Sequence, residues 1–259
     1  MKKRVLTYLL GARKIRHVKY SCWCGWGILS PPGFQFPVKE LVASLNNCKG
    51  YNYIITFFLS LNMLILVTSA EIELMKDMRS AEYRKTVEWM SKNATDYNVV
   101  WLETVSNIKP SYLKENFPCY CSNSHNSFYQ NKGANLGNAL KSFFNNCEVD
   151  DELTVETTGR YHFLDNYFFD LIQNNPGYDL YAKNDGNDQY FTGCFALKTK
   201  YMIEWVNETD WDYLNHAMIN IEKSLWDFSK RKKLNSYDVN SIHMDCNIFG
   251  IGNSVRCTV

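Results

Sequence analysis

The sequence has 259 residues, which is enough for one sizeable α/β core and an additional segment. Its formal net charge of +1 gives no overall basic excess, so we expect no nucleic-acid partner. The nine cysteines are an odd number, and at least one thiol is therefore unpaired within the chain. This favours a reducing compartment and predicts a cytoplasmic protein.

The N-terminal part of the sequence differs in character from the rest. Several Lys and Arg residues, and no acidic ones, lie between Lys2 and Lys19. The segment offers no regular apolar face that a core would bury. We interpret residues 1–62 as an N-terminal extension and residues 63–259 as a single domain.

Residues 51–70 form an uncharged apolar run that has two interpretations. The run is about as long as a membrane-spanning helix, and it could anchor a type II membrane protein whose domain faces the Golgi or ER lumen. Alternatively, residues 63–68 are the first buried strand of the domain, since buried parallel strands are also continuous apolar runs. We prefer the second interpretation, because Ser60 and Asn62 interrupt the run and a helix and a strand at residues 97–102 follow it as in a β-α-β unit. A membrane is a partner only if the run is an anchor.

The loop-rich region that follows contains Cys119 and Cys121, which would share one face of a short strand because side chains alternate along it. Together with Cys22, Cys24 and His125 they could form a zinc site, although structural zinc sites usually have two residues between paired cysteines. Buried cysteines more often serve as small hydrophobic side chains, so we expect no metal there.

In the stretch from Gln130 to Asp165 the spacing of the apolar residues changes from that of a helix to that of a strand, and the change suggests a ligand site. Its first part predicts an amphipathic helix with apolar residues at helical spacing, namely Leu136, Leu140, Phe143 and Phe144. Leu153 and Val155 then alternate with polar residues as in a short strand, which ends at Gly159 with Arg160 just beyond it. In open α/β sheets ligands bind outside the carboxyl ends of the strands, and an exposed arginine there favours a phosphate or carboxylate.

Polar residues in two later segments are also site candidates. Asp185 and Asp188 in a polar turn could hold a divalent cation, although local hydrogen bonding in turns is the more common role of such residues. A strand predicted over residues 190–198 is interrupted at Thr192 and Gly193, where glycine allows a close approach of the backbone to a ligand or forms a bulge.

A long helical pattern covers residues 211–232 and ends in basic residues, which suits the helix dipole. Glu222 lies in the middle of this pattern. Its carboxylate could be a catalytic base or a member of a surface salt bridge, and the two look alike in sequence. A last strand is expected near residues 236–244.

These segments resemble GT-A type glycosyltransferases. Asn131–Leu140 reads N-K-G-x-N-x-G-x-A-L ahead of a helix, a strand and a turn, and Thr158–Arg160 stands where such enzymes usually have a metal-binding Asp-x-Asp motif. The T-G-R-Y turn and the segment Phe191–Ala196 also resemble short glycosyltransferase-like proteins of large DNA viruses and some bacteria. The resemblance covers roughly residues 63–255 and implies an α/β fold with a GT-A (Rossmann-like) mixed sheet flanked by helices.

The resemblance further implies transfer of a hexosyl or related sugar from a nucleoside-diphosphate donor to a glycan or other hydroxyl acceptor. Arg160 and Lys132 would stabilise the diphosphate, and Glu222 would be the base that takes the proton of the acceptor. Because Arg160 replaces the acidic motif, a reaction without metal or cofactor is implied. The other donor-binding candidates are Thr68, Ser69, Glu103, Asn135, Gly137, Gly159 and Tyr161. The acceptor-side candidates are Asp188, Thr192 and Gly193.

Two other interpretations remain open. A sugar-phosphate nucleotidyltransferase shares the Rossmann-like half, but it should have a glycine-rich phosphate loop with a basic residue where this chain has Ser69, Ala70 and Glu71. A non-catalytic GT-A-like domain that binds glycans or a protein partner would account for the missing Asp-x-Asp motif.

Overall fold

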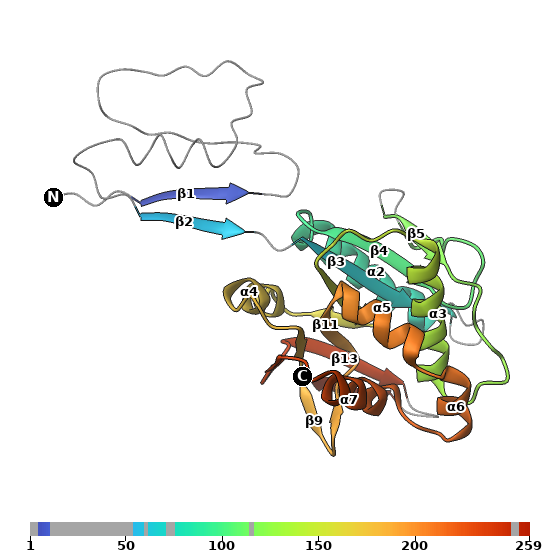
Figure 1. The fold of residues 1–259 in the computed structure, drawn as a ribbon. Coiled ribbons are helices and arrows are strands. Elements are labelled where there is room, and N and C mark those ends of the chain that lie inside the picture. Colours follow the sequence, from blue (N-terminus) through green and yellow to red (C-terminus); the bar gives the residue numbers. More distant parts are fainter. Residues whose placement is uncertain (1–4, 11–53, 60–61, 71–75, 114–116, 250–253) are drawn as a thin grey trace, which may run out of the picture. The chain divides into compact units, whose positions relative to one another are not determined.

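The computed structural model describes residues 5–10, 54–59, 62–70, 76–113, 117–249 and 254–259. It divides into two compact units, Met1–Ser60 and Leu61–Val259 (Figure 1). In the first unit, β1 (Val5–Leu10) and β2 (Ile54–Leu59) pair as parallel strands. Cys22 and Cys24 lie outside the described residues, and the predicted domain boundary after residue 62 stays a prediction.

The second unit is built on a seven-stranded mixed sheet with the strand order β12-β8-β11-β6-β3-β4-β5. These strands are β3 (Met63–Ser69), β4 (Asn98–Glu103), β5 (Cys119–Cys121), β6 (Leu153–Thr158), β8 (Leu180–Ala182), β11 (Cys194–Lys198) and β12 (Ser236–Asp238). Strand β11 runs antiparallel to both neighbours, and the other neighbouring pairs are parallel. Six strands therefore end at one edge of the sheet, here termed the carboxyl edge, which is where ligands bind in α/β folds.

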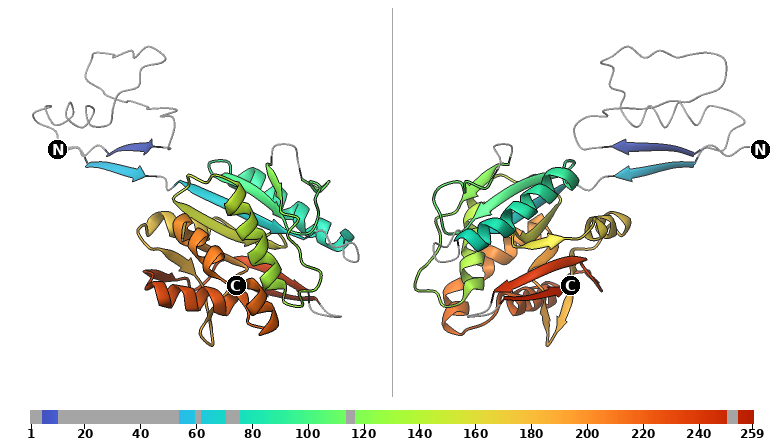
Figure 2. Two further views of the ribbon diagram at one scale, coloured as in Figure 1. Left: turned by 45° about the vertical axis from the view of Figure 1, so that its right-hand side comes forward. Right: turned by 180° about the vertical axis from the view of Figure 1, so that it is seen from behind.

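Helices and a second sheet cover both faces of this sheet (Figures 1 and 2). On one face lie α2 (Lys76–Asn93), α4 (Tyr167–Asn174) and the small sheet of β7 (Tyr161–Phe163), β13 (Met244–Phe249) and β14 (Ser254–Thr258). On the other face lie α3 (Lys132–Asn146), α5 (Thr199–Glu208), α6 (Trp211–His216) and α7 (Ile221–Lys232). The predicted fold class, a mixed α/β sheet flanked by helices, is confirmed.

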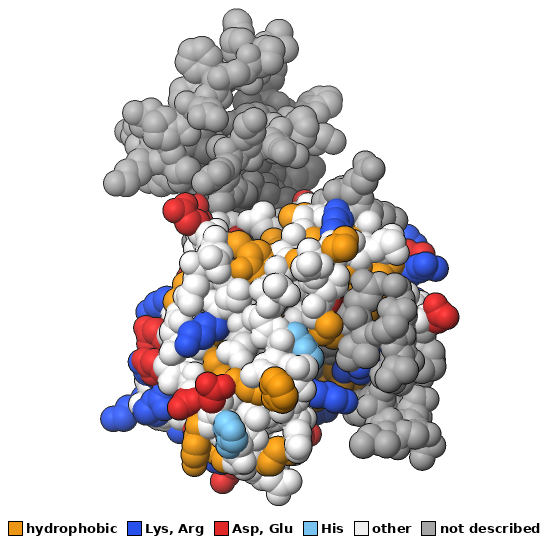
Figure 3. Space-filling view, turned by 90° about the vertical axis from the view of Figure 1, so that its right-hand side faces the viewer, with side chains coloured by type: hydrophobic (Ala, Val, Ile, Leu, Met, Phe, Trp, Pro, Cys, Tyr) orange, Lys and Arg blue, Asp and Glu red, His pale blue; other side chains and the backbone are white. Residues whose placement is uncertain are grey.

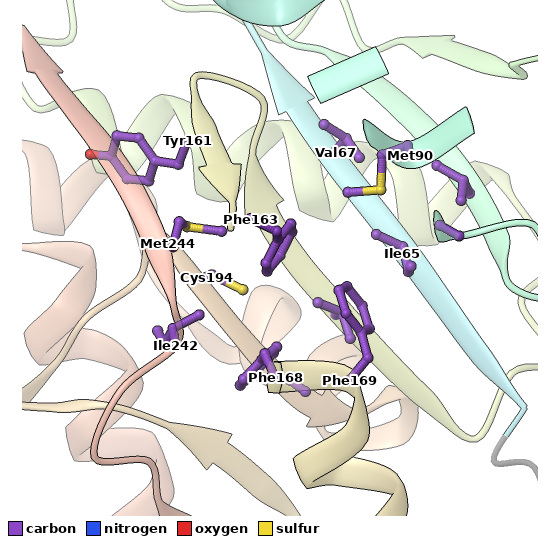
Figure 4. Close-up of a cluster of buried hydrophobic side chains, with 14 of the residues drawn as sticks. Ile65, Val67, Met90, Tyr161, Phe163, Phe168, Phe169, Cys194, Ile242 and Met244 are labelled. Carbon is purple, nitrogen blue, oxygen red and sulfur yellow. The ribbon is translucent and has the colours of Figure 1, made fainter. Parts of the chain in front are cut away.

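Strand β3 explains the apolar run in the sequence. Ile65 and Val67 belong to the buried cluster on the α2 face, which also contains Phe163 and Phe169 (Figure 4). The intervening Leu64 and Leu66 belong to the cluster on the opposite face. Because both faces are covered, residues 63–67 of the strand are all apolar, as expected for a central parallel strand, and the polar Thr68 and Ser69 follow at its carboxyl end. Within the described ranges, no helix combines the length and apolar character that a bilayer span requires.

Strand β6 differs from the half-exposed strand that its alternating sequence predicts. All its residues except Thr158 are buried, including Thr154 and Glu156. The hydroxyl of Thr154 lies 2.9 Å from that of Thr199, and the hydroxyl of Thr68 donates to Glu156. The polar positions therefore make internal hydrogen bonds, because β6 lies in the middle of the sheet between β3 and β11.

The single helix predicted over residues 211–232 is wrong, because the chain forms α6 and α7 with a break between them. Met218 adopts a left-handed conformation with φ 53°, which ends the first helix. Asn220 is the extended N-cap residue of α7. Glu222 consequently lies in the first turn of α7 and not in the middle of a helix.

Two predicted strands are also divided. The strand predicted over residues 190–198 becomes β10 (Gln189–Tyr190) and β11. Strand β10 forms a hairpin with β9 (Asn184–Gly186), whereas β11 belongs to the main sheet. The strand expected near residues 236–244 becomes β12 and β13, which belong to different sheets.

Candidate functional site

The carboxyl edge joins predicted site residues from three strands. Parallel pairing of β3 with β6 places Thr68 beside Thr158, and the amide of Gly159 donates to the carbonyl of Thr68 at 2.8 Å. Strand β11 begins at this edge because it runs antiparallel, and the carbonyl of Gly193 accepts from the amide of Thr158 at 3.1 Å. Strand register therefore assembles residues that are more than 120 positions apart in the sequence.

Arg160 lies in a tight turn that α2 holds in place. The hydroxyl of Thr86 on α2 lies 2.8 Å from the carbonyl of Gly159 and 3.2 Å from that of Tyr161. A Cβ on Gly159 would lie only 3.0 Å from the ring of Tyr83, so a side chain at this position would press on that ring. Arg160 is half-buried, and its guanidinium carbon lies 5.6 Å from the centroid of the Tyr161 ring. The turn thus places Arg160 at the carboxyl edge.

A second guanidinium, that of Arg79 on α2, lies at the same edge and is not indicated by the sequence. Arg79 is only 6% exposed, and its Nη1 donates to the carbonyl of Ala70 at 3.0 Å. Its buried Nε has no hydrogen-bond partner among the described residues. Burial lowers the pKa of Arg79, and the positive charge of Arg160 lowers it further. The positive charges of Arg79 and Arg160 therefore act on the same region of the carboxyl edge.

Glu222 faces the same edge from the first turn of α7. The hydroxyl of Thr192, which precedes β11 and is buried, donates to Oε1 of Glu222 at 2.8 Å. Glu222 itself is half-exposed, so its carboxylate can be reached from outside. Burial raises the pKa of Tyr161, Arg160 opposes that shift, and Glu222 adds to it. Arg160 and Glu222 therefore both lie within electrostatic reach of Tyr161.

Gly193 has an internal reason to be glycine. A Cβ there would lie 2.4 Å from ring atoms of both Tyr161 and Phe191. These two rings are stacked with their centroids 6.0 Å apart. The glycine lets the aromatic pair pack against the start of β11, and it is this packing that positions Thr192 next to Glu222.

Glu103 uses its carboxylate inside the protein. The hydroxyl of Ser69 donates to Oε2, and the amides of Val105 and Ser106 donate to Oε1 at 3.0 and 3.1 Å. Glu103 has an exposed fraction of 0%, so it stabilises the loop after β4 and does not reach the surface in this conformation. Its predicted contact with the nucleoside stays a prediction.

The N-terminus of α3 approaches that of α7. A Cβ on Gly133 would lie 2.8 Å from Ile221, and the neighbouring Lys132 is exposed. Lys132 is therefore a third cation near this end of the molecule, and its predicted role at the diphosphate stays a prediction.

Asn135 and Gly137 of α3 serve internal contacts. The side-chain amide of Asn135 accepts from the amide of Asn126 at 2.8 Å and donates to its carbonyl at 3.3 Å. A Cβ on Gly137 would lie 2.3 Å from ring atoms of Trp211, so the glycine allows α6 to pack closely on α3. Nothing in these contacts supports the predicted donor wall.

The two candidate metal sites receive no support from the described residues. Asp188 has φ 55° at the tip of the β9–β10 hairpin, and the side-chain amide of Gln189 donates to Asp185 at 3.2 Å. This is the local turn role that the sequence allowed. The sulfur atoms of Cys119 and Cys121 lie 3.9 Å apart on one face of β5, as predicted. No group of three or more His, Cys, Asp and Glu side chains is suitably placed for a metal ion within the described ranges.

A cavity of about 650 Å³ lies at the opposite edge of the sheet, at the amino ends of the strands. Residues that line the cavity include Leu64, Val99, Phe117 and Cys147, and none of the predicted site residues lines it.

Seen from the side that Figure 3 presents, acidic and basic side chains are interspersed over the surface.

The carboxyl edge unites most of the predicted site. The predicted residues at it are Thr68, Ser69, Glu103, Gly159, Arg160, Tyr161, Thr192, Gly193 and Glu222, of which Glu103 is fully buried. Asp185 and Asp188 lie apart from them, in the exposed β9–β10 hairpin.

No family model matches the chain, and no curated protein matches it either. Several solved structures have a distantly similar trace, and two of them are glycosyltransferases. One is the apo form of the glycosyltransferase GlyE of Streptococcus pneumoniae TIGR4, with 11% identity and a TM-score of 0.40 over 68% of this chain and 45% of GlyE. The other is the galactosyltransferase LgtC in complex with donor and acceptor sugar analogs, with 13% identity and a TM-score of 0.37 over 68% of this chain and 73% of LgtC. At such values the likeness carries no information about the substrate or reaction of this chain.

Proposed function

We propose that this protein is a glycosyltransferase that moves a sugar from a nucleoside-diphosphate donor to a hydroxyl acceptor. The observation that supports the proposal is that Arg79, Arg160 and Glu222 lie on elements that begin or end at the carboxyl edge, with Arg79 bonded to the carbonyl of Ala70 and Glu222 bonded to Thr192. The half-buried guanidinium of Arg160 suits the diphosphate of the donor, because it can make bidentate hydrogen bonds with phosphate oxygens, and the buried Arg79 adds positive charge behind it. A half-exposed carboxylate within reach of the same region suits an acceptor hydroxyl.

In the proposed reaction the acceptor oxygen attacks the anomeric carbon, and its proton passes to Glu222. The bond between the anomeric carbon and the diphosphate oxygen breaks, and its electron pair leaves with the nucleoside diphosphate. Negative charge grows on that leaving oxygen, so Arg79 and Arg160 would stabilise the transition state more than the ground state. Thr192 would hold the Glu222 carboxylate in the orientation needed to accept the proton.

The proposal includes independence from divalent metal. An Asp-x-Asp motif attracts the diphosphate indirectly by binding a dication, whereas fixed guanidiniums attract it directly. Arg160 at the end of β6 supports this part of the proposal.

Isothermal titration of the full chain tests the proposal. UDP, GDP and CMP are titrated in the presence of EDTA, followed by the corresponding sugar donors, and nucleotide release from each donor is then measured. We expect binding of at least one nucleoside diphosphate and release that depends on Glu222. A chain that gives no heat with any nucleotide or donor would instead be a non-catalytic domain that binds glycans or a protein.

A further inference from the structure

A second carboxyl group lies buried in β6, which pairs with β11 just after Thr192, the residue that bonds Glu222. Glu156 is in the middle of β6, with Leu66 and Phe195 as its register partners on the two sides. Its exposed fraction is 0%. Oε1 accepts from the hydroxyl of Thr68 at 2.9 Å, and Oε2 has no hydrogen-bond partner among the described residues. Burying an ionised carboxylate with one oxygen unbonded costs much free energy, and burying the neutral carboxylic acid costs much less.

The surroundings of Glu156 favour its neutral form. Burial raises the pKa of Glu156 to about 8, the Thr68 hydrogen bond opposes that shift, and the negative charge of Glu222 adds to it. The thiol of Cys194 on β11 also interacts electrostatically with Glu156. Burial raises the pKa of that thiol, so it carries no charge at neutral pH. Among the residues that the structure describes, no cation influences the pKa of Glu156.

We propose that Glu156 is a positioning residue that keeps its proton at neutral pH, so that the Glu156–Glu222 pair carries a single negative charge located on Glu222. Two carboxylates that interact across a poorly solvated region do not both ionise readily, and the more buried one retains the proton. Burial and the unpartnered Oε2 identify Glu156 as that group, while Glu222 is half-exposed and lies at a helix N-terminus.

The catalytic meaning of this inference rests on the proposed function. A neutral Glu156 leaves Glu222 ionised and able to accept a proton from the acceptor hydroxyl. When Glu222 takes that proton, the repulsion at Glu156 disappears. Glu156 itself touches no substrate, since it is fully buried, and it acts only through Glu222 and Thr68.

Stability against pH gives a test that needs no substrate. A carboxyl whose pKa is higher in the folded than in the unfolded state stabilises the fold at low pH, and this contribution is lost as the pH rises from about 4.5 to about 8. Replacing Glu156 by Gln keeps the shape of the acid and removes the ionisation. We therefore expect the melting temperature of Glu156→Gln to equal that of the wild type near pH 5 and to exceed it clearly at pH 8.5. The exposed Glu148→Gln is the control, for which we expect no such crossover.

Glu222→Gln tests the coupling. Removing the negative charge of Glu222 should lower the pKa of Glu156, so the pH at which the melting temperature falls should move downward. In parallel, ¹³C NMR of chains with labelled glutamate carboxyls should reveal one that titrates above pH 7 in the wild type and at lower pH in Glu222→Gln. The NMR measurement needs only the wild type and Glu222→Gln, so it remains decisive if Glu156→Gln folds poorly.

The outcomes separate this inference from the proposed function. Absence of a glutamate that titrates above pH 7, or a titration that Glu222→Gln leaves unchanged, would overturn the inference whatever the chain binds. If the two carboxyls titrate as a coupled pair but the chain binds no nucleotide, the inference about Glu156 holds and the proposed glycosyltransferase function is wrong.

Discussion

The hydroxyl of Thr192 donates a hydrogen bond of 2.8 Å to Oε1 of Glu222. This contact links the start of β11, the antiparallel strand of the main sheet, to the first turn of α7. Thr192 is buried and Glu222 is half-exposed, so the bond restrains the carboxylate from the protein side while part of the side chain stays open to solvent. A base needs this combination of a fixed orientation and an open approach.

Glu222→Gln should keep the fold and the binding of nucleotide but lower turnover about 100-fold or more, the range typical of losing a general base. The amide has the same shape as the carboxylate and can still accept from Thr192. The measurements are kcat and KM for donor consumption, together with the melting temperature. Asp227→Asn on the exposed side of α7 is the control, and we expect it to retain normal turnover.

An unchanged rate in Glu222→Gln would return this residue to the role of an ordinary charge at a helix N-terminus. The base would then be sought elsewhere, with Asp185 and Asp188 of the β9–β10 hairpin as the next candidates.

The fold could be predicted from the sequence wherever the spacing of apolar residues was regular. The run at residues 63–68 and the apolar spacing of Leu136, Leu140 and Phe143 each correspond to an element close to the predicted bounds. The break between α6 and α7 could not be predicted from period alone. The break depends on the left-handed backbone conformation of Met218, and a methionine in the sequence does not indicate that conformation.

The site was predictable where it follows strand ends and not where it depends on tertiary contacts. Arg160 comes directly after a strand and a glycine, so its location could be inferred. Arg79 is one cation among several on a helix, and only the folded chain buries it beside Ala70. Glu156 reads as the exposed residue of an alternating strand, whereas α3, α5 and α7 cover that face of the sheet.

Gly137→Ala should destabilise the protein through the contact between α3 and α6. The added methyl would lie 2.3 Å from the ring of Trp211, and that ring is fixed because its Nε1 donates to the carbonyl of Val206 at 3.0 Å. Overpacking of this kind costs about 1–3 kcal/mol of stability. Replacing glycine by alanine in a helix gains at most about 1 kcal/mol, so we expect a net loss. Thermal unfolding measures the loss. Asn145→Ala on the exposed side of α3 is the control and should leave the melting temperature unchanged or slightly higher.

A chain that starts at Leu61 should fold and bind ligand as the full chain does. Residues Leu61–Val259 contain both buried clusters, and the carbonyl of Asn62 accepts from the amide of Glu152 at 3.0 Å, so this residue is retained. Circular dichroism, thermal unfolding and nucleotide titration of the two chains check the expectation. Loss of folding in the shorter chain, or partition of the full chain into membranes that resist alkaline extraction, would contradict it and favour the membrane anchor.

Arg160→Ala should weaken the binding of a nucleoside diphosphate without unfolding the protein. Charged hydrogen bonds contribute about 1.5–3 kcal/mol, so we expect affinity about 10- to 100-fold lower. Arg160→Lys should recover only part of the loss, because an ammonium group cannot make the bidentate contact of a guanidinium. The exposed Arg84→Ala on α2 is the matched control and should bind normally.

The alternative role for Arg160 is structural, as an ion-pair partner that pins the turn. Measuring both the melting temperature and the affinity of Arg160→Ala separates the roles, because a structural arginine lowers the first and a ligand-binding arginine the second. Wild-type affinity should also survive EDTA, since the guanidiniums attract the diphosphate without an intervening dication. A destabilised Arg160→Ala that binds normally would falsify this account, and so would a wild type that EDTA silences and Mn²⁺ restores.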